Sequence, residues 1–237
     1  MEIPILCDSF YLAYGVERYV TWCPSKAPHA IICGATGSGK TYFTQLLLGK
    51  LALYIENCEI AVCDFKNDDD YQYLEGANHF YRYMECQKGL ETFYQAFQSR
   101  QSGEDKTRNM KVLLFEEWAS YLNSIDKKEQ DNEKRKLSNL LMLSRSFNMQ
   151  VIICVQRADA QYFATARDNA NLIIGLGNLS DESRSMLFSA YRNEMLPDRK
   201  QGTGYMLTSG TNLTAVQVPA ISNVKKLHKV IREAVNR

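Results

Sequence analysis

The sequence predicts a three-layer α/β fold, in which helices cover both faces of a mostly parallel central sheet and a β-hairpin follows near the C-terminus. Three observations support this fold class. Short apolar runs recur without polar alternation, amphipathic stretches separate them, and 237 residues are enough for one large α/β domain. Continuous apolar strands separated by helices are typical of parallel sheets that are buried on both faces.

The first half of the chain is expected to supply two strand–helix pairs. Residues 29–33 (HAIIC) form an apolar run that ends at a glycine, and residues 60–63 (IAVC) form a second run. Residues 40–54 follow the first strand with apolar side chains near helical spacing, and residues 86–100 follow the second in the same way. A polar loop is expected over residues 98–109.

The second half continues this alternation and then changes character near its end. We expect, in order, a strand at 112–115, a helix at 134–148, strands at 151–155 and 172–174, a hairpin of residues 202–207 and 213–218, and a short helix from Val224.

We expect residues 1–237 to form a single domain, with residues 1–28 as an N-terminal lead-in. Residues 126–136 (DKKEQDNEKRK) carry charges of both signs and are expected to form a charged surface loop. The 28 Lys and Arg residues nearly balance the 27 Asp and Glu residues, which gives a net charge of +1. This balance excludes a polybasic protein that binds nucleic acid through bulk charge, so any DNA contact requires local patches.

The composition also indicates a cytoplasmic protein. Its seven cysteines are odd in number and include no CxxC pair, which favours reduced thiols over disulfides or a zinc site. No apolar run reaches the roughly 18 residues that a membrane-spanning helix needs. The N-terminus (MEIPILCDSF) lacks the basic segment of a signal peptide. Any association with a membrane would therefore come through a partner.

Residues 34–41 (GATGSGKT) match the phosphate-binding pattern GxxxxGK[ST] between a predicted strand and a predicted helix. Glycines let such a loop curl so that its N–H groups point at phosphate oxygens, and the helix N-terminus adds partial positive charge. Lys40 is expected to reach the β- and γ-phosphates of ATP, and Thr41 to contact Mg²⁺. A glycine-rich turn that only caps a helix is the structural alternative. The predicted nucleotide-binding residues are Gly34, Ala35, Thr36, Gly37, Ser38, Gly39, Lys40 and Thr41.

Polar residues follow two of the other predicted strands at their C-terminal ends. Glu116 and Glu117 follow residues 112–115, and Gln156 follows residues 151–155. We assign Glu116 to the metal ion, Glu117 to activation of the attacking water, and Gln156 to orientation of that water or detection of the γ-phosphate. The structural alternatives are two acids at the start of a helix and a polar cap at a strand end.

Beyond these sites, an ordered set of motifs resembles the FtsK/SpoIIIE DNA translocases and the wider FtsK–HerA family of P-loop ATPases, which includes conjugation coupling proteins. The resemblance spans roughly residues 20–220 and implies a RecA/HerA-like P-loop NTPase fold. The matching segments are KAPH at 26–29, ATGSGK at 35–40, DFK at 64–66, FEEW at 115–118, LSR at 143–145, VIICVQR at 151–157, SDESR at 180–184 and GTGYML at 202–207.

This resemblance implies a hexameric ring that pulls double-stranded DNA through a central pore at the expense of ATP and Mg²⁺. In such a ring an arginine of one subunit completes the site of its neighbour. Arg145, eleven residues before Gln156, matches that position, and Arg184 is the second candidate. Lys127 and Lys128 stand where family members carry basic pore-loop residues, although a charged surface loop would explain them equally well. A membrane-bound or recruiting partner protein is also implied.

The sequence departs from the family pattern at Glu116, where the family has Asp, and at Phe65, where it has Pro. The longer side chain at 116 could weaken hydrolysis. Four functions therefore stay open: a DNA translocase, the same motor used in conjugation, virion packaging or type VII secretion, a small-molecule kinase, and a nucleotide-binding scaffold that does not hydrolyse ATP.

Overall fold

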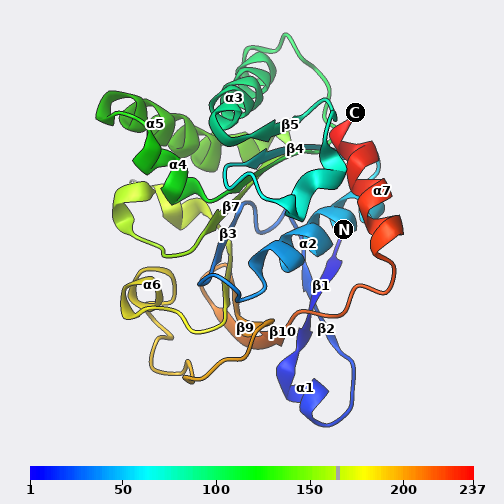
Figure 1. Cartoon of the computed structure of the whole chain (residues 1–237), viewed down its shortest axis with the longest axis vertical. Coiled ribbons are helices and arrows are strands. Elements are labelled where there is room, and N and C mark those ends of the chain that lie inside the picture. The colour runs from blue at the N-terminus through cyan, green and yellow to red at the C-terminus, as the bar shows by residue number, and fades with distance from the viewer. Residues whose placement is uncertain (164–165) are drawn as a thin grey trace.

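The computed structural model describes residues 1–163 and 166–237, and its strands form one ten-stranded sheet in the order β2-β1-β10-β9-β8-β3-β7-β6-β4-β5 (Figure 1). The six strands from β8 to β5 run parallel, and β9, β10, β1 and β2 add antiparallel pairings on one side. The strands are β1 (Ile3–Asp8), β2 (Tyr19–Trp22), β3 (Ala30–Cys33), β4 (Glu59–Asp64), β5 (Phe80–Arg82), β6 (Lys111–Glu116), β7 (Met149–Val155), β8 (Leu172–Leu176), β9 (Thr203–Thr208) and β10 (Asn212–Gln217).

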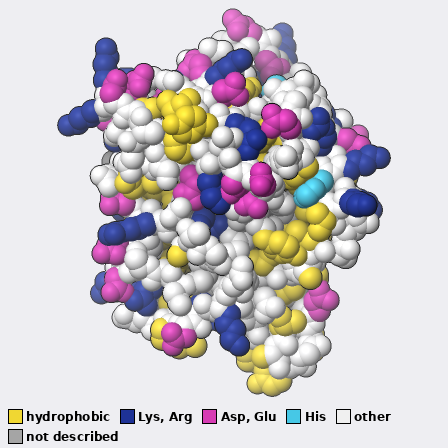
Figure 2. Space-filling view, viewed as in Figure 1, with side chains coloured by type: hydrophobic (Ala, Val, Ile, Leu, Met, Phe, Trp, Pro, Cys, Tyr) yellow, Lys and Arg dark blue, Asp and Glu magenta, His cyan; other side chains and the backbone are white. Residues whose placement is uncertain are grey.

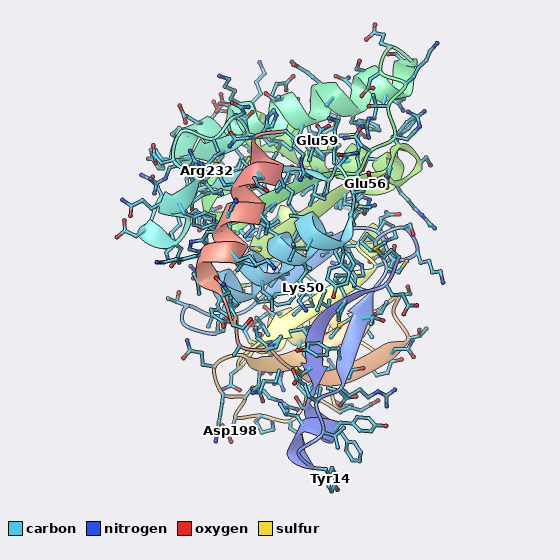
Figure 3. All side chains as sticks on the ribbon, turned by 90° about the vertical axis from the view of Figure 1, so that its right-hand side faces the viewer. Tyr14, Lys50, Glu56, Glu59, Asp198 and Arg232 are labelled. Carbon is cyan, nitrogen blue, oxygen red and sulfur yellow. The ribbon has the colours of Figure 1, made fainter. Side chains whose placement is uncertain are left out.

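Helices cover both faces of this sheet, which confirms the predicted three-layer α/β fold. Neighbouring residues of β3 show why: Ile32 joins the core under α2 and α7, while Ile31 joins the core under α3, α4 and α5. In Figure 3, α7 crosses directly over α2, and Arg232 projects from it. The helices are α1 (Ser9–Ala13), α2 (Lys40–Tyr54), α3 (Cys86–Ser102), α4 (Trp118–Ser124), α5 (Lys127–Leu143), α6 (Asp181–Leu187) and α7 (Val224–Val235).

Most predicted elements are confirmed, with shifts of a few residues at their ends. The helix expected at 40–54 has these bounds in the structure, and β9 and β10 form the expected antiparallel hairpin. The lead-in of residues 1–28 contains more structure than we predicted. It contributes β1 and β2, and β1 pairs with β10, so the start of the chain extends the sheet beyond the hairpin.

The prediction of a charged surface loop at 126–136 is wrong. Only Asp126 lies outside the helix, where its side chain accepts a hydrogen bond from the Glu129 N–H and begins α5. Lysine, glutamate and glutamine are good helix formers. The fully buried Glu133 fixes this half of the helix, because it accepts a bond from the Tyr121 hydroxyl and pairs with Lys136. The helix predicted at 134–148 therefore begins seven residues too late, and the observed helix ends at Leu143 rather than at residue 148.

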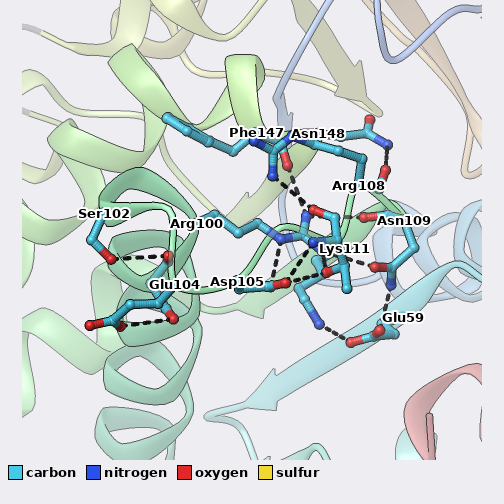
Figure 4. A network of polar contacts seen from close by, with 12 residues as sticks. Glu59, Arg100, Ser102, Glu104, Asp105, Arg108, Asn109, Lys111, Phe147 and Asn148 are labelled. Atoms are coloured by element: carbon cyan, nitrogen blue, oxygen red, sulfur yellow. Dashed lines mark hydrogen bonds and ion pairs between the residues drawn. The ribbon is translucent and has the colours of Figure 1, made fainter.

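A buried arginine anchors the segment that leads into β6. The Arg100 side chain is fully buried, and its guanidinium donates to Asp105, Thr107, the side-chain oxygen of Asn109 and the main-chain oxygens of Asn109 and Phe147 (Figure 4). These bonds tie α3 to the chain immediately before β6. The chain enters β6 from this anchored segment, and β6 ends at Glu116.

All seven cysteines are free thiols, and six of them are buried. Across the described residues, no helix is both long and apolar enough to cross a membrane.

Candidate nucleotide-binding site

Four parallel strands end at the same edge of the sheet and place their following residues around one cavity of about 240 Å³. Its walls come from the loop after β3, the start of α2, and the ends of β4, β6 and β7. The lining residues are Thr36, Gly37, Gly39, Lys40, Thr41, Tyr42, Asp64, Lys66, Asp68, Asp70, Tyr71, Glu116, Glu117, Gln156 and Gln201. The structure thus brings the predicted lysine, both glutamates and the glutamine together, although they are far apart in sequence.

The loop at residues 34–41 has the curled backbone that a phosphate cradle requires. Gly37 and Gly39 adopt φ values of +79° and +97°, which only glycine accepts without strain. A Cβ atom at Gly37 would meet nothing within 4 Å, so backbone conformation, rather than crowding, requires glycine there. The loop leads directly into α2, whose first N–H groups and positive dipole end face the cavity.

Lys40 is held beneath this loop with its ammonium group already in place. Its side chain is 7% exposed, and Nζ donates to the main-chain oxygens of Gly34 at 2.6 Å and of Ala35 at 3.4 Å. An ammonium group surrounded by carbonyl oxygens at the bottom of a cradle is placed to contact a phosphate that enters above it.

Glu116 is the last residue of β6, lines the cavity and is 4% exposed. Its Oε1 accepts hydrogen bonds from the hydroxyls of Thr44 and Tyr71, both at 2.8 Å. Burial raises the pKa of Glu116, and these two hydrogen bonds oppose that shift because they favour the ionised form.

Glu117 adopts a left-handed backbone conformation, with φ +58° and ψ +44°, at the residue before α4. This turn directs its carboxylate into the cavity beside Gln156, whose Nε2 donates to Glu117 Oε1 at 3.3 Å. The Ser120 hydroxyl lies 3.4 Å from the other carboxylate oxygen. A carboxylate held by two long bonds can release them and accept a proton from water.

Asp64, at the end of β4, is a cavity residue that sequence reasoning left without a role. It pairs with Glu116 across the parallel strands and is 1% exposed. Its Oδ1 accepts from the Asn67 N–H, while Oδ2 has no hydrogen-bond partner and lies 3.7 Å from Arg82 Nε. Burial raises the pKa of Asp64 to about 6. Its position at the end of a strand was the available signal, and we had read it only as part of the DFK segment.

The remaining predicted residues lie outside this cavity. Arg145 is exposed in the short helix Ser144–Phe147, which precedes β7, and its charge acts on His29, which precedes β3, at the opposite edge of the sheet. Arg184 lies on α6, where it pairs with Asp181 and lines a different cavity. Lys127 and Lys128 are exposed in the first turn of α5.

Two buried oxygens near the phosphate loop and the strand ends could bond to a ligand. The Ser38 hydroxyl and Asp64 Oδ2 are buried without hydrogen-bond partners, so both have bonding capacity left. The described residues contain no group of three or more His, Cys, Asp or Glu that could hold a metal ion. Magnesium in nucleotide sites is commonly held by one or two protein oxygens, phosphate oxygens and water, which is what Thr41 and Glu116 could supply.

Comparison with known proteins gives an FtsK domain-containing relative and solved structures with the same fold. No protein-family model matches the sequence. The chain is 24% identical, over 79% of its length, to the FtsK domain-containing protein YdcQ of Bacillus subtilis strain 168, and spans 42% of that protein.

Three solved structures share the fold. The cytoplasmic domain of the type VII secretion ATPase EccC of Thermomonospora curvata has a TM-score of 0.71 at 18% identity, over 99% of this chain and 31% of that one. The pCW3 conjugation coupling protein TcpA, in a monomer form with ATPγS, has a TM-score of 0.66 at 17% identity, over 92% and 65%. The genome packaging NTPase B204 of Sulfolobus turreted icosahedral virus 2, in complex with AMPPCP, has a TM-score of 0.56 at 14% identity, over 81% and 98%.

The resemblance predicted from the motifs is therefore confirmed: the chain is a homologue of an FtsK domain-containing protein and has the P-loop ATPase fold of the FtsK–HerA family.

Proposed function

We propose that this chain is an ATP-hydrolysing motor that, as a ring, moves double-stranded DNA. The observation that carries the ATPase part is the single cavity in which Lys40 and the curled loop lie opposite Glu117 and Gln156. Binding groups for an anionic tail and a carboxylate for water activation converge there from four separate strands. The small-molecule kinase alternative receives no comparable support.

Each side chain has a defined task in this proposal. The loop N–H groups and Lys40 hold the phosphates of ATP, and Glu117 takes a proton from the attacking water. Gln156 orients Glu117 and that water relative to each other. Thr41 and Glu116 would hold Mg²⁺, which neutralises phosphate charge when bound.

The site is incomplete without a neighbour, because no arginine lines the cavity in the described part of the chain. Arg145 is solvent-exposed at the other edge of the sheet, from which it could reach only the site of another subunit. We propose Arg145 for this role and Arg184 as the second candidate. In a mixture of Lys40→Met and Arg145→Ala subunits, turnover above that of either variant alone would support a contribution in trans. No recovery, with mixed rings shown to form, would exclude Arg145.

The DNA assignment rests on the resemblance of the motifs to those of DNA translocases and on exposed cations rather than on bulk charge. Figure 2 shows Lys and Arg side chains interspersed with Asp and Glu on the face that it presents, so no continuous basic surface covers it. Lys127 and Lys128 in α5 are the proposed DNA contacts. A cytoplasmic location and recruitment by a membrane-bound partner complete the proposal.

Phosphate release by the assembled protein, with and without duplex DNA, tests this function. A DNA motor would be supported if DNA stimulated turnover by the wild-type protein but not by the double variant Lys127→Glu/Lys128→Glu. The turnover of the double variant without DNA should match that of the wild type. Turnover that is indifferent to DNA but rises with a candidate secreted protein would instead indicate a secretion motor.

A non-hydrolysing scaffold is the second candidate, and the glutamate at position 116, where the family pattern has aspartate, favours it. In that case the protein would bind ATP without releasing phosphate, even when assembled with DNA. Glu116→Asp would then restore turnover.

A further inference from the structure

We propose that Tyr71 is a positioning residue for Glu116: its hydroxyl holds the Glu116 carboxylate in the orientation that contacts the magnesium ion of a bound nucleotide. This inference rests on the proposed ATPase function. It adds a residue that lies in none of the predicted nucleotide-binding motifs.

Three oxygens form a compact cluster at the wall of the cavity, which both Tyr71 and Glu116 line. The hydroxyls of Tyr71 and Thr44 lie 2.8 Å from each other, and each lies 2.8 Å from Glu116 Oε1. Thr44 Oγ1 is also 3.0 Å from the main-chain oxygen of Thr41, and a hydroxyl has only one proton to donate. When Thr44 donates its proton to that main-chain oxygen, the Tyr71 hydroxyl is left as the donor to Glu116, with Thr44 Oγ1 as a second oxygen within its reach.

The segment that carries Tyr71 is held from both sides. Tyr71 lies in the short helix Asp69–Leu74 and is 1% exposed. Gln45 of α2 donates to the main-chain oxygen of Asp70 at 2.7 Å. Arg232 of α7 donates to the main-chain oxygen of Tyr73 at 2.7 Å. A tyrosine hydroxyl that is buried in this way needs a partner, and Glu116 supplies it.

The chemistry explains why a glutamate at this position needs such a partner. A glutamate has one more rotatable bond than the aspartate of related motors, so more conformational freedom must be lost before its carboxylate can act. A hydrogen bond of 2.8 Å to Oε1 removes part of this freedom before a metal ion binds. Tyr71 thus fixes the orientation of the carboxylate.

Nucleotide affinity with and without magnesium tests this role independently of turnover. The dissociation constant of a fluorescent ADP is measured once in EDTA and once in Mg²⁺. The value in EDTA divided by the value in Mg²⁺, called the metal ratio, reports how much the metal ion adds to affinity. In Tyr71→Phe we expect this ratio to fall about tenfold, as for other residues that support a metal ligand, with the EDTA value unchanged. Tyr73→Phe is the matched control, because its hydroxyl is buried without a partner on the same short helix.

A second readout uses a double-mutant cycle. In a Glu116→Gln background, Tyr71→Phe should no longer lower the metal ratio, because the carboxylate that Tyr71 positions is absent. If Mg²⁺ strengthens nucleotide binding by the wild-type protein and the metal ratio of Tyr71→Phe is equal or greater, the role of Tyr71 would be overturned while the proposed ATPase function would stand. Absence of nucleotide binding by the wild-type protein would instead overturn the proposed function.

Discussion

Replacement of Glu117 by glycine should make the protein more stable and also inactive. A residue other than glycine in the left-handed region costs about 1–2 kcal/mol, and the φ of +58° places Glu117 there. Glycine removes this cost but gains freedom in the unfolded chain, which offsets about 0.5–1 kcal/mol. The two hydrogen bonds that are lost are long, 3.3 and 3.4 Å, so they subtract little. The net gain in unfolding free energy is about 0.5–1 kcal/mol.

Thermal and urea unfolding measure this gain, which corresponds to a rise in Tm of about 1–4 °C for a chain of this size. Glu117→Gln is the matched control, because it keeps the strained backbone while it removes the base. We expect its unfolding free energy to stay within about 0.5 kcal/mol of wild type. If Glu117→Gly were no more stable than Glu117→Gln, the argument that the fold tolerates strain in order to aim this carboxylate would be refuted.

Three further predictions concern the same account. Lys40→Met should weaken nucleotide binding about 10- to 100-fold, the value of a hydrogen bond to a charged group, and fluorescent ADP titration measures this change. Arg100→Met should lower the unfolding free energy by about 2–5 kcal/mol, because it removes the donor to two partly buried carbonyls and to three side-chain oxygens, whereas the exposed Arg108→Met should have little effect in urea. Asp64 has its pKa raised from 3.8 to about 6 in the fold, so its contribution to stability is present below about pH 4 and is lost as the pH rises through 6. The stability of Asp64→Asn relative to wild type should therefore rise between these pH values, and a constant difference would contradict the shift.

The parallel part of the sheet and the phosphate loop could be predicted because their signals are local. Apolar strands such as residues 151–155 are unbroken, and the motif at 34–41 fixes a strand before it and a helix after it. The charged run at 126–136 was misread because apolar periodicity in α5 begins only at Leu137. Its first half is held instead by Glu133, whose bonds to Tyr121 and Lys136 leave no periodic signal.

The motif residues of the candidate site could be predicted from the sequence, but the residues that hold them in place could not. Glu117 and Gln156 could be identified from their place after apolar strands. Tyr71 could not, because its contact with Glu116 joins residues 45 positions apart through a short helix that no local pattern indicates. Arg145 was chosen from spacing alone, and only the fold shows that it lies at the opposite edge of the sheet.

Phosphate release and nucleotide binding, measured side by side on assembled wild-type, Lys40→Met and Glu117→Gln proteins, test the central claim most directly. We expect the wild-type protein to bind ATP and release phosphate, Glu117→Gln to bind ATP while release falls about 10²- to 10⁴-fold, and Lys40→Met to bind ATP about 10- to 100-fold more weakly and to release no phosphate. Release by Glu117→Gln at the wild-type rate, or undiminished binding by Lys40→Met, would show that the cavity formed by these residues is not the site of ATP hydrolysis.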